Sequence, residues 1–181
     1  MNREKLKLLM PYIGIPVLAI LLLLMRRSSL DAFRLLQSEL LLVIGYFAAA
    51  KDIREKVVSN RTVLVLLVCW LLTMLPQMVV NINVGLDRLV DAFAGFLIGG
   101  ILFLLVYLIS RNGLGGGDVK FMSVAGLYLG LNRVLPAVLY GSILATLFGL
   151  VLILLKKIDR KGTIPLIPFL YVGILLAIFF F

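Results

Sequence analysis

Histidine is absent from this sequence of 181 residues, and cysteine occurs only once, as Cys69. Without histidine, the chain cannot use Ser-His or Cys-His catalysis, histidine metal clusters or histidine proton relays. One cysteine cannot form an internal disulfide or a zinc site of several thiolates. Carboxylates are therefore the main candidates for acid and base chemistry, and we expect neither a metal ion nor another cofactor.

Charged residues are also scarce, at 15% of the chain, whereas 62% of the residues are hydrophobic. The mean hydropathy of +1.14 excludes a soluble domain with a polar shell around one core. The composition predicts an integral membrane protein in contact with the lipid bilayer. The net charge of +9 comes from 18 Lys and Arg against 9 Asp and Glu. In a membrane protein such an excess sets the orientation in the bilayer, so we expect no nucleic-acid partner.

Seven apolar stretches divide the sequence and predict an all-α integral membrane protein with about seven transmembrane helices. Most of them approach the ~20 residues that a helix needs to cross the hydrocarbon core. The fifth is short, at 13 residues, and fits either a thin or tilted span or a re-entrant segment. The first follows three basic residues and has no small-residue cleavage site, which predicts a retained helix. The stretches are Leu8 to Met25, Leu35 to Ala50, Val63 to Val80, Leu89 to Ile109, Val119 to Leu131, Val134 to Leu155 and Ile164 to Phe181.

The basic residues are distributed unequally between the two sides that seven crossings would define. The amino terminus and the second, fourth and sixth connections together hold 13 of the 18 Lys and Arg. Because basic residues concentrate in cytoplasmic loops, the sequence predicts a multi-pass protein of the cytoplasmic membrane. Its amino terminus is expected inside and its carboxyl terminus outside. A re-entrant fifth stretch would divide the 18 basic residues equally, which favours seven crossings.

Two acidic residues directly adjoin apolar stretches, Asp52 and Asp118, and both fall on the predicted cytoplasmic side. An ionisable group near hydrocarbon is costly, which makes each a candidate functional residue. Asp118 follows Gly115, Gly116 and Gly117, whose lack of side chains permits the close approach of another chain. Each aspartate also has a structural interpretation: Asp52 as a solvated charge beside the membrane, and Asp118 as a helix N-cap.

Two other patterns are weaker candidates. The glycine-rich segment lacks the Gly-Lys-Ser/Thr ending of a phosphate-binding loop, and Asp118 would repel a phosphate. Asp87 and Asp91 are four residues apart and would share a helix face. Arg88 lies between them in sequence and no permissive loop is near, so we interpret these residues as an interfacial charged cluster.

A pair of aspartates would support peptide hydrolysis. Two carboxylates close together in a site with little water cannot both stay charged at low cost, so they share a proton. Such a pair can activate a water molecule against a peptide carbonyl while protonating the carbonyl oxygen, as in an aspartic protease. The titration belongs to the pair, so neither Asp52 nor Asp118 is given a fixed role as acid or base.

Three motifs resemble, in order, those of the prepilin peptidase family. These membrane aspartyl proteases of the Gly-x-Gly-Asp class mature type IV pilins and related secretion pseudopilins. The first motif runs from Asp52 through Arg54 to Asn60, and is similar to the family's Asp-Leu-Arg followed by Ile-Pro-Asn. The second is Gly-Gly-Gly-Asp-Val-Lys at 115–120. The third is Ile-Pro-Leu-Ile-Pro-Phe at 164–169, similar to the Ile-Pro-Phe-Gly-Pro-Phe that opens the family's last helix.

The resemblance implies roles for individual residues. Asp52 and Asp118 match the two catalytic aspartates of the family. The glycines would let an extended peptide lie against the backbone, and two basic side chains would orient the carboxylates or nearby lipid headgroups. The residues implied to bind substrate or to shape the site are Gly115, Gly116, Gly117, Lys120, Arg54 and Asn60.

The sequence departs from the family pattern at two positions. Ser59 stands where the family usually has proline, which removes a rigid turn-former. Ile167 stands where it has a flexible glycine. Both changes bear on how the loops would hold a substrate, and neither removes a catalytic carboxylate.

The resemblance covers roughly Leu40 to Phe181. It implies a six-helix domain over residues 35–181, preceded by an N-terminal helix and its connection over residues 1–34. The implied activity is cleavage of a short basic leader from a pilin-like precursor at the cytoplasmic membrane face. Larger members carry a further cytoplasmic domain with paired Cys-x-x-Cys motifs, linked to methylation of the product. With one cysteine, the chain is expected to be a peptidase without N-methyltransferase activity.

Two other functions fit parts of the sequence. A catalytically inactive homologue could act as a membrane adaptor of a pilus or secretion assembly, using the same loops only for binding. A small ion or proton transporter would use a carboxylate within the membrane. The transporter predicts an acidic residue near the middle of a span, whereas Asp52 and Asp118 lie at the ends of spans.

Overall fold

The computed structural model describes residues 32–110, 114–156 and 164–181, and the regular structure within these ranges is entirely helical. Its helices are α2 (Ala32–Glu55), α3 (Asn60–Val80), α4 (Ile82–Ser110), α5 (Gly116–Leu154) and α6 (Ile167–Phe180). The helices α2 to α5 are long and apolar enough to cross a membrane, and α6 is a shorter apolar helix. The all-α prediction is therefore confirmed for these residues, whereas the predicted first span, Leu8 to Met25, lies outside them.

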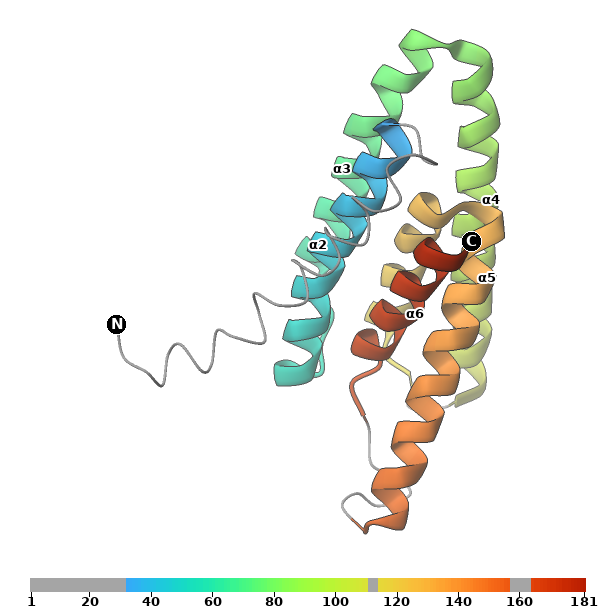
Figure 1. Ribbon diagram of the computed structural model, residues 1–181. Coiled ribbons are helices and arrows are strands. Elements are labelled where there is room, and N and C mark those ends of the chain that lie inside the picture. The colour runs from blue at the N-terminus through green and yellow to red at the C-terminus, as the bar shows by residue number, and fades with distance from the viewer. Residues whose placement is uncertain (1–31, 111–113, 157–163) are drawn as a thin grey trace.

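The chain runs up and down through the bundle and reverses within α5. Figure 1 shows α2, α3 and α4 as successive antiparallel helices, followed by an α5 that turns back on itself. The reversal lies at Gly130, whose φ of 68° and ψ of −175° interrupt the helix. The predicted fifth and sixth stretches are therefore the two limbs of α5. The number of membrane crossings stays a prediction.

Asp91 of α4 contacts this reversal. Its Oδ1 accepts a hydrogen bond of 2.9 Å from the backbone N–H of Leu131, one of the donors that the start of a helix leaves unpaired. A Cβ atom at Gly130 would collide with the Asp91 carboxylate, and the positive φ there is open mainly to glycine. Asp91 thus has a specific structural role that its interpretation as part of an interfacial cluster did not include.

Small residues bring α4 and α5 into close contact. A Cβ atom added at Gly95 of α4 or at Gly126 of α5 would collide with the backbone of the other helix. Such contacts are typical of helix pairs in membranes, where dispersion forces replace the hydrophobic effect between helices. Side chains of α3 add polar contacts: Trp70 Nε1 donates to the Leu127 carbonyl at 3.0 Å. The remaining faces of α3 and α4 expose many apolar side chains, as expected for contact with lipid.

One end of the bundle gathers the helix termini that matter for the site. The end of α2, the start of α3, the end of α4 and the start of α5 lie together there, and α6 begins nearby (Figure 1). Asp52 is in the last turn of α2 and Asp118 is in the first turn of α5. The alternating helix directions therefore bring both aspartates to the same end.

Candidate active site

Asp52 is buried against the start of α6. Only 4% of the residue is exposed, and its Oδ2 accepts a hydrogen bond of 3.0 Å from the backbone N–H of Ile167. Ile167 is the first residue of α6, and the N-cap residue Leu166 provides no side-chain bond. Because the first N–H groups of a helix need acceptors and carry a partial positive charge, the Asp52 carboxylate fits this position. The interpretation of Asp52 as a solvated charge is wrong.

Asp118 bonds to the segment that precedes its own helix. Its Oδ2 accepts a hydrogen bond of 3.0 Å from the Gly115 N–H, and its own N–H donates to the Gly115 carbonyl at 3.0 Å. Gly115 is the N-cap and Asp118 is the third residue of the helix, an arrangement that pairs two donors reciprocally. The interpretation of Asp118 as the N-cap is therefore wrong in position: Gly115 is the N-cap, and Asp118 bonds to it from the third position of the helix. Asp118 is 9% exposed.

The two aspartates line one cavity with a volume of about 370 Å³. Their carboxylates are close enough for their charges to interact, and the charge of Lys56 acts on Asp52. Three connections form the remaining walls: the loop after α2, the segment before α5 and the segment before α6. The lining residues are Asp52, Lys56, Val57, Val58, Leu114, Gly115, Gly116, Gly117, Asp118, Ile164, Pro165 and Leu166.

The three glycines before Asp118 differ in what surrounds them. A Cβ atom at Gly117 would lie 2.8 Å from the Cβ of Val58, too close for the two chains to keep their positions. A Cβ atom at Gly115 would lie 3.2 Å from Asp118 Oδ2, whereas one at Gly116 would meet nothing within 4 Å. All three line the cavity, but close chain approach requires glycine chiefly at Gly117.

Three other residues singled out from the sequence lie outside the cavity lining. Lys120 Nζ donates a hydrogen bond of 3.1 Å to Asn60 Oδ1, which joins the first turns of α5 to the start of α3. Arg54 is exposed in the last turn of α2. The structure therefore brings Asp52, Asp118 and the glycines together, and pairs Lys120 with Asn60 outside the cavity lining.

The two departures from the family pattern have physical explanations. Ser59 is the N-cap of α3, and its Oγ accepts a hydrogen bond of 3.3 Å from the Arg61 N–H. A serine can make this bond and a proline cannot. Ile167 contributes its backbone N–H to Asp52, which every residue except proline carries, while its side chain is fully buried in the core.

Two features of the site were not predicted from the sequence. They are the backbone N–H of Ile167, which bonds to Asp52, and the position of Lys56 in the cavity wall. Lys56 has a φ of 52°, unusual for a residue with a side chain, and its N–H donates to the Asp52 carbonyl at 2.8 Å. Its position four residues after Asp52 was the available signal. Within the described ranges, no group of three or more His, Cys, Asp or Glu side chains could hold a metal ion.

Known proteins are similar to part of this chain. The prepilin leader peptidase/N-methyltransferase of Bacillus subtilis is 32% identical over 88 residues, which are 47% of this chain and 36% of the relative. The protein of the same description from Aeromonas salmonicida is 31% identical over 88 residues, 48% of this chain and 30% of the relative. The match thus spans about a third of these relatives. No solved structure matches the chain.

A family model supports the same relationship over a longer region. The model of the type IV leader peptidase family matches residues 39–150, which is more than half of the chain and includes both Asp52 and Asp118. The chain belongs to the type IV leader peptidase family, the prepilin peptidases.

Proposed function

We propose that the chain is an aspartic endopeptidase that removes the short basic leader from type IV pilin-like precursors, with Asp52 and Asp118 as its catalytic pair. The observation that carries the proposal is that two buried carboxylates, from helices far apart in the sequence, line one cavity. Membership of a leader peptidase family supplies the reaction class. An aspartate pair fits it, because histidine is absent and the single cysteine, Cys69, does not line the cavity.

The chemistry follows from one proton shared by the two carboxylates. The unprotonated carboxylate takes a proton from a water molecule as its oxygen attacks the peptide carbonyl carbon, and the protonated carboxyl group gives its proton to the carbonyl oxygen. As the C–N bond of the tetrahedral intermediate breaks, the carboxyl group that took the proton from water gives it to the departing amine. The other carboxylate takes a proton from a hydroxyl of the intermediate as the new carbonyl forms, which restores the shared proton. The bonds from Ile167 to Asp52 and from Gly115 to Asp118 hold the carboxylates in place. The titration belongs to the pair.

The setting that fits this reaction is a multi-pass protein of the cytoplasmic membrane. The sequence excess of Lys and Arg assigns the end with Asp52 and Asp118 to the cytoplasm, with the amino terminus inside and the carboxyl terminus outside. The apolar helix of the precursor docks from the bilayer, and its leader reaches the cavity from the cytoplasm. Residues 35–181 form the six-helix peptidase domain of this proposal, and the additional helix expected at Leu8 to Met25 lies outside the described residues.

The proposal assigns no N-methyltransferase activity to these 181 residues. The similar proteins are described as both peptidase and N-methyltransferase, but the similarity covers about a third of their length. A single cysteine leaves no pair of Cys-x-x-Cys motifs in this sequence. Mass spectrometry of the processed product checks this point, because methylation would add the mass of one methyl group to the new N-terminus.

Co-expression with a pilin-like precursor tests the peptidase. We expect the wild-type chain to shorten the precursor, and Asp52→Asn and Asp118→Asn each to abolish the shortening, because asparagine cannot exchange the shared proton. Asp87→Asn is the matched control, since Asp87 is exposed and lies outside the cavity. Normal processing by both of the first two variants would exclude the catalytic pair. A folded wild-type chain that binds precursor without cutting it would indicate an adaptor.

A further inference from the structure

Lys56 closes the end of α2 in a backbone conformation that residues with a side chain rarely adopt. Its φ is 52°, and its N–H donates to the Asp52 carbonyl at 2.8 Å. These features define a helix end closed by a left-handed residue, a position that glycine usually occupies because it has no Cβ atom to clash. A lysine here carries a conformational cost that a glycine would avoid.

The side chain of Lys56 brings a positive charge to the cavity. Among the described residues that line the cavity, Lys56 is the one cation. Its charge acts on Asp52, whereas the charge that acts on Asp118 is the negative charge of Asp52. Lys56 also interacts with a further group of the protein, and it keeps its charge in that contact. The electrostatic surroundings of the two aspartates therefore differ.

Backbone groups add to this difference. Asp52 accepts the Ile167 N–H at 3.0 Å, and the backbone of Leu166 also favours its charged form. Both groups belong to the start of α6, which carries a partial positive charge. Asp118 has the start of its own helix and one backbone bond, from the Gly115 N–H. The negative charge of the pair is therefore better supported on Asp52.

One feature of α2 opposes a charge on Asp52, and Lys56 offsets it. Asp52 lies in the last turn of α2, where the carbonyl groups of the helix end carry a partial negative charge. A cation at such a helix end is stabilising. Lys56 follows the last residue of α2 and supplies this cation at the cavity wall.

The other charged side chains at this end of the described structure lie outside the cavity lining. Lys51 pairs with Glu55 at 3.5 Å on α2, and α6 contains no charged residue. The charges in residues 111–113 and 157–163 lie outside the described residues. The remaining charged residues at this end are exposed, and they are Arg54, Arg61, Lys120 and Lys156.

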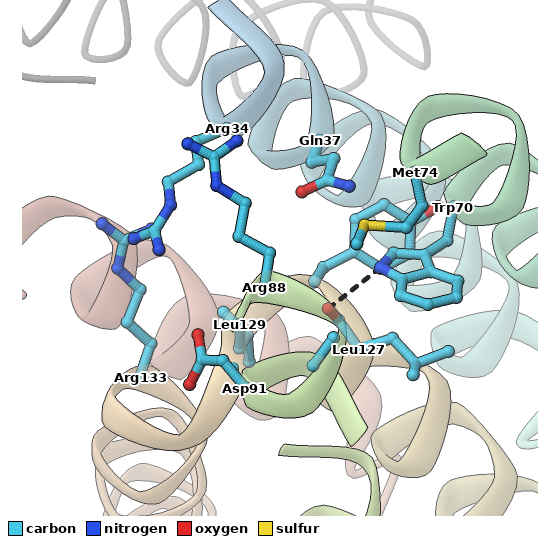
Figure 2. Close-up of a pocket in the computed structure, with 12 residues that line it drawn as sticks. Arg34, Gln37, Trp70, Met74, Arg88, Asp91, Leu127, Leu129 and Arg133 are labelled. Atoms are coloured by element: carbon cyan, nitrogen blue, oxygen red, sulfur yellow. Dashed lines mark hydrogen bonds between the residues drawn. The ribbon is translucent and has the colours of Figure 1, made fainter. Parts of the chain in front are cut away.

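The charged groups toward the other end of the bundle are far from the pair. Figure 2 shows them around a small cavity beside the reversal of α5, where the charged residues are Arg34, Arg88, Asp91 and Arg133. Eighteen positions of α2 separate Arg34 from Asp52, which is about 27 Å of helix. Because the interaction of two charges falls with distance, these groups do not distinguish one aspartate of the pair from the other.

We propose that Lys56 is a positioning residue of the peptidase, whose charge keeps the negative charge of the pair on Asp52 and the shared proton on Asp118. This role rests on the function proposed above. Asp52 then takes the proton from water as the water oxygen attacks the peptide carbonyl, and Asp118 gives its proton to the carbonyl oxygen. The titration still belongs to the pair, and Lys56 sets which member carries the proton for most of the time.

The pH profile of kcat/KM for the purified full chain, measured on a pilin-like precursor, tests this role. We expect Lys56→Gln to move the acid limb of the profile to higher pH by about one unit, because the base is protonated more readily without its cation. Cleavage on that limb should fall about tenfold, and cleavage above it should change little. Lys56→Arg retains the charge and the backbone cost, so it should keep the wild-type profile. Arg61→Gln removes an exposed charge outside the cavity and should also keep it.

Replacement by glycine separates the side chain from the backbone. Lys56→Gly removes the charge and relieves the positive φ. We expect it to unfold about 2–4 °C above the wild type in detergent, and to show the same shift of the acid limb as Lys56→Gln. Lys156 is the matched control, because it has a φ of 55° and does not line the cavity. Lys156→Gly should gain similar stability and keep the wild-type pH profile.

The results that overturn the role of Lys56 differ from those that overturn the peptidase. A wild-type profile for both Lys56→Gln and Lys56→Gly excludes it, as does an equal shift in Lys156→Gly. A shift in Lys56→Arg as large as in Lys56→Gln, or an equal fall in rate at every pH without a shift, would show that the charge is not what matters. In each of these cases Asp52→Asn still abolishes cleavage. Normal cleavage by both Asp52→Asn and Asp118→Asn would instead reject the peptidase, and the role of Lys56 with it.

Discussion

The backbone N–H of Ile167 donates a hydrogen bond of 3.0 Å to the Asp52 carboxylate, across 115 residues of sequence. The bond joins the first residue of α6 to the last turn of α2, and it sets the orientation of one member of the proposed catalytic pair.

Replacing Ile167 with proline tests the importance of the backbone donor. Ile167→Pro removes the N–H, whereas Ile167→Ala keeps it. Both lose a fully buried side chain, and the alanine variant should lose about 2–5 kcal/mol of stability. We expect the rate of precursor cleavage per folded molecule to be roughly tenfold to a hundredfold lower in the proline variant than in the alanine variant. A factor of this size corresponds to the loss of one hydrogen bond to a charged group. Equal cleavage by the two folded variants would show that the bond is dispensable.

Gly116 and Gly117 at the start of α5 allow a test of whether close packing against Val58 requires glycine. Gly117→Ala would place a Cβ atom 2.8 Å from that of Val58, so we expect a lower unfolding temperature and reduced cleavage. Gly116→Ala meets no neighbouring atom and should be neutral or gain about 0.4–1 kcal/mol by restricting the unfolded chain. Thermal unfolding in detergent measures both. A Gly117→Ala variant as stable as Gly116→Ala would contradict the close packing of Val58.

The reversal of α5 should depend on Gly130. Gly130→Ala would put a side chain at a positive φ and in collision with the Asp91 carboxylate. We therefore expect the free energy of unfolding to fall by about 1–3 kcal/mol or more. Asp91→Asn keeps an oxygen that can accept from the Leu131 N–H, whereas Asp91→Ala leaves that donor unpaired and should cost about 1–2 kcal/mol more. Chemical unfolding of the three variants gives the comparison. Identical stabilities of the asparagine and alanine variants would exclude the capping role of Asp91.

Ser59 allows the departure from the family proline to be tested directly. Ser59→Ala removes the N-cap bond of α3 and should cost about 0.5–2 kcal/mol. Ser59→Pro also removes the bond, but the native φ of −71° suits proline. Because proline restricts the unfolded chain, it should offset about 0.4–1 kcal/mol of the stability lost with the hydrogen bond. We therefore expect the proline variant to unfold at a higher temperature than the alanine variant. The reverse order would show that proline strains the loop before α3.

The sequence was sufficient to predict the helical class and to select Asp52 and Asp118, because long apolar stretches and isolated charges beside them are strong local signals. The alternation of helix directions then predicted that both lie at one end. The contribution of Ile167 could not be predicted, since a backbone N–H has no side-chain signature and its partner is remote in sequence. Gly130 was equally hidden, because nothing marks one of 16 glycines as the point where α5 reverses.

The positions of the basic residues required three-dimensional information. Lys120 and Arg54 are next to the aspartate motifs in sequence, which suggested contact with the carboxylates. Helix geometry instead turns Lys120 toward Asn60, and leaves Arg54 exposed. Lys56, which did not stand out in the sequence, lines the cavity because its positive φ turns the chain at the end of α2. Proximity in sequence was a poor guide where a helix ends and a loop begins.

The bond from Ile167 to Asp52 also fixes an order of events during biosynthesis. Asp52 emerges from the ribosome 115 residues before its partner, a delay of roughly 6 to 23 s at typical rates of ~5–20 residues per second. Throughout this interval Asp52 lacks the donor that orients it, and the wall of the cavity formed by the segment before α6 does not exist. Under the proposed function, the site of a nascent chain would therefore stay incomplete until α6 has been synthesised and has docked.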